Sequence, residues 1–144
     1  NIRNFSFDKD ARNISRRYRD FISILIMSFV AKRFEKNEPP YTAEDISEEC
    51  QIPIRLTNQT LYELQEINLL HEVVTDTKSQ DIAYQPSMDI NKLNVAFLLD
   101  KLDTHGSEDF KIDKDKEFHG QWETLMKARE EYYKSASQVL LKDL

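Results

Sequence analysis

The fold of this chain depends on one stretch, IPIRLTNQTLYELQEINLL, residues 52–70. Thr57, Leu61 and Leu64 share one face of a helix built from it, because residues three and four apart are neighbours on a helix surface. Four other side chains fall on the opposite face: Arg55, Asn58, Gln59 and Tyr62. Pro53 suits the first turn of this helix, and Asn68 suits the left-handed position after its end. The stretch therefore predicts an amphipathic helix with a polar outer face.

Two more helices are expected before this stretch. Residues 15–37 carry apolar side chains at intervals of three and four, with Ser15 as a suitable N-cap. Pro39 cannot continue that helix. The next helix opens at Thr42, and we expect Cys50 on its inner side as a small buried hydrophobe.

A hairpin is expected after the third helix. Apolar and polar residues alternate in residues 70–75 and again in IAYQP, residues 82–86, and the polar stretch TDTKSQD joins the two runs. Three helices followed by a two-stranded hairpin form the winged helix-turn-helix pattern. The expected fold class is mainly α with a small β-hairpin (α+β), with extra N- and C-terminal helices.

The C-terminal part predicts two more helices and a linker. Residues 87–105 have a helical period that ends at Gly106, a polar linker covers 107–118, and a final helix is expected over 121–144. We divide the chain into a basic lead-in segment (1–14), a winged-helix domain (15–104), and a charged linker with a C-terminal helix packed on that domain (105–144).

The charge of the third helix disfavours DNA as its partner. Residues 42–70 contain one basic residue, Arg55, against six acidic ones, and duplex binders usually neutralise several phosphates. The hairpin tip offers Lys78 between two aspartates. Arg, Asn and Gln side chains can nevertheless bond base edges. Nucleic-acid binding therefore remains an alternative, with the candidate residues Arg55, Asn58, Gln59, Tyr62 and Lys78.

The first 33 residues are basic although the whole chain is acidic. They carry a balance of +5 in a chain of net charge −6. Part of this charge forms a basic segment: Arg12, Arg16, Arg17 and Arg19. Three interpretations stay open, namely a solvated first helical turn, a nucleic-acid contact, and a stretch on the cytoplasmic side of a membrane span.

No pattern in the sequence indicates catalysis. The chain has one cysteine, 3 His without metal-site spacing, and only 2 Gly with which to build a phosphate loop. The carboxylates of the linker alternate with lysines, which is typical of a solvated segment. The apolar run at residues 21–31 is too short to span a bilayer. We expect no catalytic residue, no metal and no cofactor.

Several phrases resemble a known family: RRYRDFISILIMSFVAKRF, PPYTAEDISEECQIPIRLTNQTLYEL, DINKL, and HGSEDFKID through to LLKDL. They look like the C-terminal soluble region of Bacteroidetes members of the YihY/BrkB family, multi-spanning membrane proteins labelled ribonuclease BN-like. The helix-turn-helix core is equally similar to Rrf2-type transcription regulators, although this chain lacks their cluster-binding cysteines.

The YihY/BrkB resemblance implies a domain at the cytoplasmic face, tethered to the inner membrane through an upstream segment. The start at Asn1 instead of Met agrees with a piece of a longer protein, or with processing or a trimmed tag. We expect a non-catalytic interaction or regulatory domain with a protein partner or self-association. The alternatives are a winged-helix DNA-binding transcription regulator and an RNA-contacting domain linked to tRNA processing.

Overall fold

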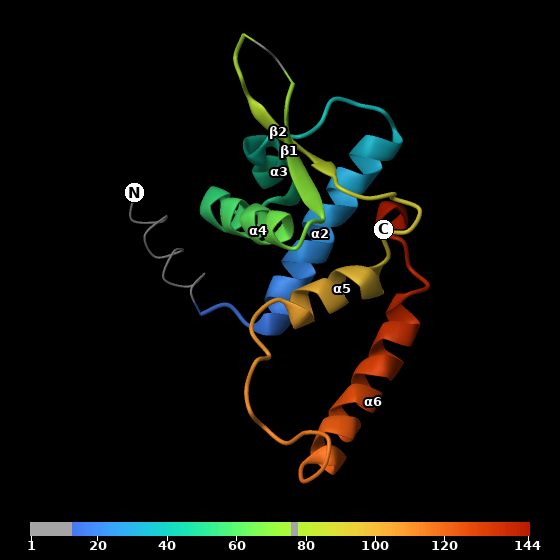
Figure 1. Ribbon diagram of the computed structural model, residues 1–144. Coiled ribbons are helices and arrows are strands. Elements are labelled where there is room, and N and C mark those ends of the chain that lie inside the picture. The colour runs from blue at the N-terminus through green and yellow to red at the C-terminus, as the bar shows by residue number, and fades with distance from the viewer. Residues whose placement is uncertain (1–12, 76–77) are drawn as a thin grey trace.

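The computed structural model describes residues 13–75 and 78–144. Helix α2 (Arg16–Glu35) runs through the middle of the molecule, and most other elements pack on it (Figure 1). Its N-cap is Ser15, as predicted, because the Ser15 hydroxyl accepts a hydrogen bond from the Tyr18 amide at 3.1 Å. The chain leaves the helix through Asn37, whose φ of 53° is left-handed.

The hydrophobic core lies between α2 and the helices of the predicted helix-turn-helix. Its fully buried side chains include Ile26 and Met27 of α2, Ile46 of α3 (Ala43–Cys50), and Leu61 and Leu64 of α4 (Ile54–Glu66). Burying one such aliphatic side chain stabilises the fold by about 1.5–3 kcal/mol. These contacts fix α4 against the body by its inner face, which leaves its outer face to solvent.

Local signals position α3 and α4. Thr42 and Asp45 form a capping box: each side chain accepts a hydrogen bond from the other residue's amide, at 3.2 and 3.0 Å. Gln51 turns the chain with a left-handed φ of 56°. Pro53 lies just before the first residue of α4 and not within its first turn. Cys50 is half-buried, so our prediction of a buried side chain was wrong in degree.

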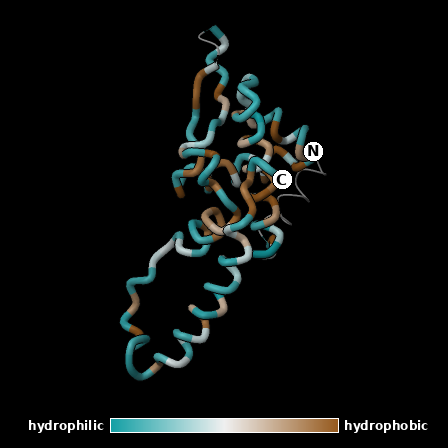
Figure 2. The backbone as a smooth tube through the Cα atoms, turned by 90° about the vertical axis from the view of Figure 1, so that its right-hand side faces the viewer, coloured by the Kyte–Doolittle hydropathy of each residue, from teal (hydrophilic) through white to brown (hydrophobic). Residues whose placement is uncertain are grey.

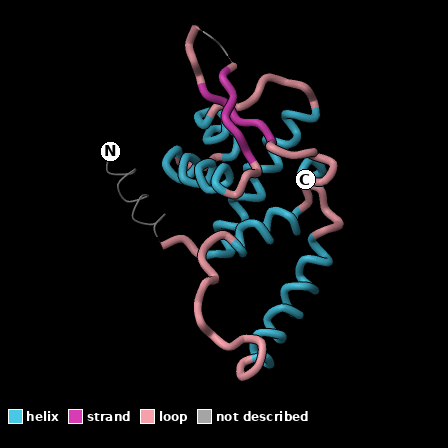
Figure 3. Tube along the Cα trace, in the orientation of Figure 1, coloured by secondary structure: helices cyan, strands magenta, loops and turns pink. Residues whose placement is uncertain are grey.

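The predicted hairpin is confirmed. Strands β1 (Leu70–Val74) and β2 (Ile82–Pro86) pair antiparallel, with Leu70 opposite Pro86 and Val74 opposite Ile82. The Tyr84 amide of β2 also donates to the Tyr41 carbonyl at 3.0 Å, just before α3. The base of the wing is therefore fixed to the helix-turn-helix, while its tip extends away from the body (Figure 3).

The fourth predicted helix is shorter than expected. Helix α5 covers only Val95–Thr104, and Asn94 caps it by accepting a hydrogen bond from the Phe97 amide at 2.8 Å. Residues 87–94 form turns because the Asp89 carboxylate accepts hydrogen bonds from the amide and side chain of Asn91, which competes with helix formation. Phe97 is exposed, contrary to its place in the predicted apolar repeat.

The last helix also has different bounds from the prediction. Helix α6 is His119–Ala136, and the chain then folds back into the short 3-10 helix η1 (Leu141–Asp143). Leu141 is fully buried, and its amide donates to the Leu93 carbonyl at 3.0 Å. Helix α6 has no buried residue, and apolar residues are sparse along it and its linker (Figure 2). It packs mainly on α5 and extends beyond the winged helix (Figure 1).

Replacing Leu141 by alanine is expected to lower the free energy of unfolding by about 2–5 kcal/mol, because a cavity would replace a core side chain. Urea denaturation followed by circular dichroism measures the change. Leu144→Ala is the matched control: Leu144 lies three residues on but is 48% exposed, so we expect a change below about 0.5 kcal/mol. Equal effects of the two substitutions would contradict the packing of the C-terminus described above.

Candidate nucleic-acid interface

The outer face of α4 carries the residues that the sequence predicted there. Arg55, Asn58, Gln59 and Tyr62 are all exposed, whereas Thr57 and its neighbours on the inner face are buried. The Thr57 hydroxyl donates to the Pro53 carbonyl at 3.0 Å, so its burial leaves no unsatisfied donor. Helix α4 therefore presents one continuous polar face, with side chains that can bond base edges or a protein surface.

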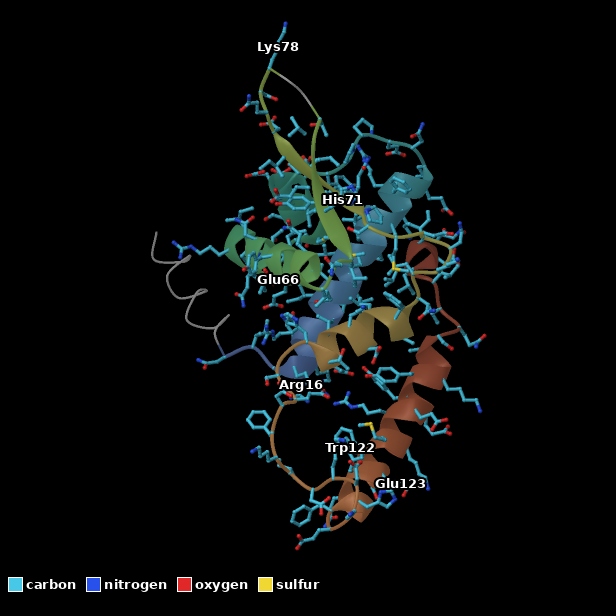
Figure 4. The ribbon with its side chains drawn as sticks, in the orientation of Figure 1. Arg16, Glu66, His71, Lys78, Trp122 and Glu123 are labelled. Atoms are coloured by element: carbon cyan, nitrogen blue, oxygen red, sulfur yellow. The ribbon has the colours of Figure 1, made fainter. Side chains whose placement is uncertain are left out.

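The wing and α4 enclose a shallow hollow of about 420 Å³. Asn58 lines it from α4, Glu44 from the start of α3, and Asp81 and Tyr84 from the hairpin. Burial raises the pKa of Tyr84, and the charges of Glu72 and Glu44 raise it further. Lys78 lies at the tip of the wing and does not line this hollow (Figure 4). A long ligand such as a duplex would have to touch α4 and the wing tip at separate points.

The negative charge near α4 is lower than the linear count indicated. Glu63 forms an ion pair with Arg19 of α2, at 2.6 Å between guanidinium and carboxylate. Asp45 is engaged in the capping box at the start of α3. A hydrogen bond with Glu66 raises the pKa of the Tyr62 hydroxyl, which keeps that hydroxyl protonated as a donor. Of the six acidic residues, Glu63 is thus paired with a cation from outside the window over residues 42–70, whereas Asp45 bonds an amide inside it.

The basic segment divides between two surfaces. Arg16 and Arg19 line a cavity between α2, α4, α5 and α6, while Arg17 lines an adjacent hollow without contributing to that cavity. Arg16 lies at the start of α2 (Figure 4). Arg12 lies outside the described residues. Arg16 and Arg19 therefore share one side of α2, which borders the molecule's own clefts as well as solvent.

Sequence inspection missed one cluster between α5 and α6. The Asp103 carboxylate accepts hydrogen bonds from Arg129, at 2.8 Å, and from the Tyr133 hydroxyl, at 2.6 Å. Burial raises the pKa of Tyr133, and its hydrogen bond to Asp103 raises it further. No spacing signal could have revealed this cluster, because an irregular linker separates Asp103 from its partners in the sequence.

The described residues hold no site of obvious chemical reactivity. Within residues 13–75 and 78–144, no group of three His, Cys, Asp or Glu side chains is placed to hold a metal ion. Burial raises the pKa of the Cys50 thiol to about 11, so little thiolate forms at neutral pH. His119 contacts Glu123 one turn along α6 at 2.7 Å. In the same described ranges, no helix has both the length and the hydropathy needed to cross a bilayer.

Comparisons by sequence and by structure give different results. Neither a protein-family model nor a curated protein matches the chain. Among solved structures, T. potens IscR matches with a TM-score of 0.60 and 17% identity, covering 90% of this chain and 83% of that one. Staphylococcus aureus CymR matches with a TM-score of 0.59 and 15% identity, covering 87% and 93%. CymR, the global cysteine regulator of B. subtilis, matches with 0.60 and 15%, covering 90% and 93%.

These matches leave the YihY/BrkB resemblance and its ribonuclease label without support, and the membrane attachment stays a prediction. The matched structures are regulators of the Rrf2 type. At such low identity the likeness establishes the fold alone. The mainly helical winged helix with a two-stranded hairpin is confirmed, and its fold is similar to that of the matched regulators.

Proposed function

We propose that this chain is a DNA-binding transcription regulator that works as a dimer. The observation that carries the proposal is the outer face of α4, where Arg55, Asn58, Gln59 and Tyr62 are exposed together. In the winged-helix architecture this helix enters the major groove, where Arg suits guanine and Asn or Gln suits adenine. The fold shared with known regulators supports this function over the protein-docking module that the charge count favoured.

The acidic body limits how such a protein would hold DNA. Among the described residues, the outer face of α4 and the wing offer few cations, namely Arg55 and the wing-tip Lys78. Each phosphate contact makes the slope of log K against log salt concentration steeper by roughly 0.9. A single chain makes few such contacts, so it would bind a duplex weakly. Two chains double the number of contacts and read two half-sites. The charge distribution therefore makes self-association part of the proposed function.

The surface of α6 supports self-association with a second copy of this chain. Leu125, Ala128 and Tyr132 are exposed at helical spacing on one face of α6, about a quarter turn from Arg129 and Tyr133, through which α6 bonds Asp103 of α5. Such a helix gains little stability from its own chain alone, because most helical stability in proteins comes from packing of an apolar face. Tyr132 also borders an open hollow of about 520 Å³, which includes the apolar side chains Phe21, Ile24 and Leu99.

Arg55→Ala is expected to weaken binding to a preferred duplex by about 1–3 kcal/mol, roughly 5- to 150-fold, because a base-edge contact is lost. The preferred sequence would be selected from a random duplex pool at low salt, and affinities measured by fluorescence anisotropy. Lys111→Ala, which removes an exposed cation from the linker, is the matched control and should leave affinity almost unchanged. No binding of wild-type protein at tens of micromolar would refute the proposed function.

The double substitution Leu125→Gln with Tyr132→Gln is expected to convert a dimer into a monomer, because it removes two apolar side chains from the face of α6 proposed to meet the second copy. Sedimentation velocity measures the mass of the species. Lys127→Gln with Lys134→Gln introduces the same residue type at the same spacing on α6 and should leave the dimer intact. The proposed interface would be contradicted if the wild-type protein were a monomer, or if the variant Leu125→Gln with Tyr132→Gln were still a dimer.

A further inference from the structure

A cavity lies where α2, α4, α5 and α6 meet. Its volume is about 590 Å³, within the range of roughly 300–1,000 Å³ that is usual for small-molecule sites. The charged residues that line it are Arg16, Arg19, Asp20, Glu63, Asp103 and Arg129, and His105 lies among them. Its apolar lining is aliphatic: Ile14, Ile67 and Leu102. The α4 residues proposed to contact DNA do not line it.

Two ion pairs organise the polar part of the cavity. Arg19 contacts Glu63 at 2.6 Å, and Arg129 contacts Asp103 at 2.8 Å. Each contact involves one terminal nitrogen, whereas a guanidinium carries five N–H donors. Both arginines therefore keep donor capacity for a further acceptor in the same space.

The remaining two charges, on Arg16 and Asp20, do not form an ion pair with each other within the described structure, although both line the cavity. Burial raises the pKa of Asp20, and the charge of Asp103 raises it further, while Arg16 and two other arginines act in the opposite direction. In the described structure Asp20 forms no ion pair, because Arg19 and Arg129 contact Glu63 and Asp103 instead. A ligand cation beside Asp20 would form such a pair.

The balance of charge selects the class of ligand. The three arginines and three carboxylates of the lining cancel when His105 is neutral. A simple anion would meet Asp20, which forms no ion pair in the described structure, and a simple cation would meet Arg16. A zwitterion satisfies both, with its carboxylate toward the guanidinium groups and its ammonium toward Asp20.

We propose that this cavity binds a free α-amino acid with an apolar side chain. The arginines hold its carboxylate, Asp20 holds its ammonium group, and Ile14, Ile67 and Leu102 contact its side chain. The ligand carboxylate would also compete with Glu63 for Arg19. The ion pair between Arg19 and Glu63 joins α2 to the second half of α4. Binding of the amino acid would therefore change a contact of the helix proposed to read DNA. Binding of the amino acid does not itself require DNA.

Isothermal titration calorimetry of the full chain with L-leucine, L-valine, L-methionine and L-phenylalanine tests the proposal. We expect at least one of them to bind with a dissociation constant below about 10 mM. The N-acetyl derivative of that amino acid lacks the ammonium group, and its methyl ester lacks the carboxylate, so each should bind at least about tenfold more weakly. These comparisons use wild-type protein and do not depend on whether any variant folds.

Two substitutions locate the site. Arg16→Gln and Asp20→Asn are each expected to weaken binding at least about tenfold, because each removes one charged partner of the zwitterion. Arg17→Gln is the matched control. Arg17 is the next residue of α2 but borders the adjacent hollow instead of this cavity, so the affinity of this variant for the amino acid should not change.

Three outcomes would overturn the proposal. They are no binding of any of the four amino acids, equal binding of the N-acetyl derivative, which indicates a plain anion site, and equal binding of the methyl ester, which indicates a plain cation site. Loss of DNA binding by the protein would refute the proposed function but not this site, because the titrations contain no DNA.

Discussion

The burial of one face of α2 is the constraint on which the rest of the structure depends. Ile26 and Met27 are fully enclosed, and α3, α4, β2, α5 and η1 all pack on this helix. The helix-turn-helix, the wing and the C-terminal segment therefore share one core instead of forming separate ones. A molecule of this kind is expected to unfold as one cooperative unit. The outer face of α4 can be polar because its inner face supplies the apolar contacts that hold it against the body.

Electrostatics in this protein depends on the fold more than on the local sequence. A window over residues 42–70 counts six acidic residues, but it excludes Arg19, which reaches Glu63 from another helix. Surface ion pairs contribute little to stability, commonly below about 1 kcal/mol. The importance of this pair lies in joining α2 to the helix whose outer face is offered to a partner. Charge counts along a sequence thus describe solubility better than they describe a binding surface.

The winged helix itself was predictable from the sequence because its signals are local. The Ser15 and Thr42 caps, the apolar period of residues 15–37 and the alternation of the hairpin each specify their own element. The C-terminal half was predicted less well. The Asp89 turn replaced a helical segment, and the period of α6 gave no indication that Leu141 returns to the core. The cavity beside α2 joins four elements distant in sequence, so no spacing could reveal it.

The return of the chain to α5 has a consequence for how two copies can meet. Helix α6 leaves from the end of α5 through Gly106, whose φ of 135° suits only glycine, and it comes back to the beginning of α5 where Asn94 pairs with Leu140. The segment that contains α6 therefore begins at one end of α5 and is hydrogen-bonded to its other end. Exchange of α6 between subunits by domain swapping would have to break that pairing and withdraw Leu141 from the core. For the dimer proposed above, a side-by-side approach of intact chains avoids breaking these contacts.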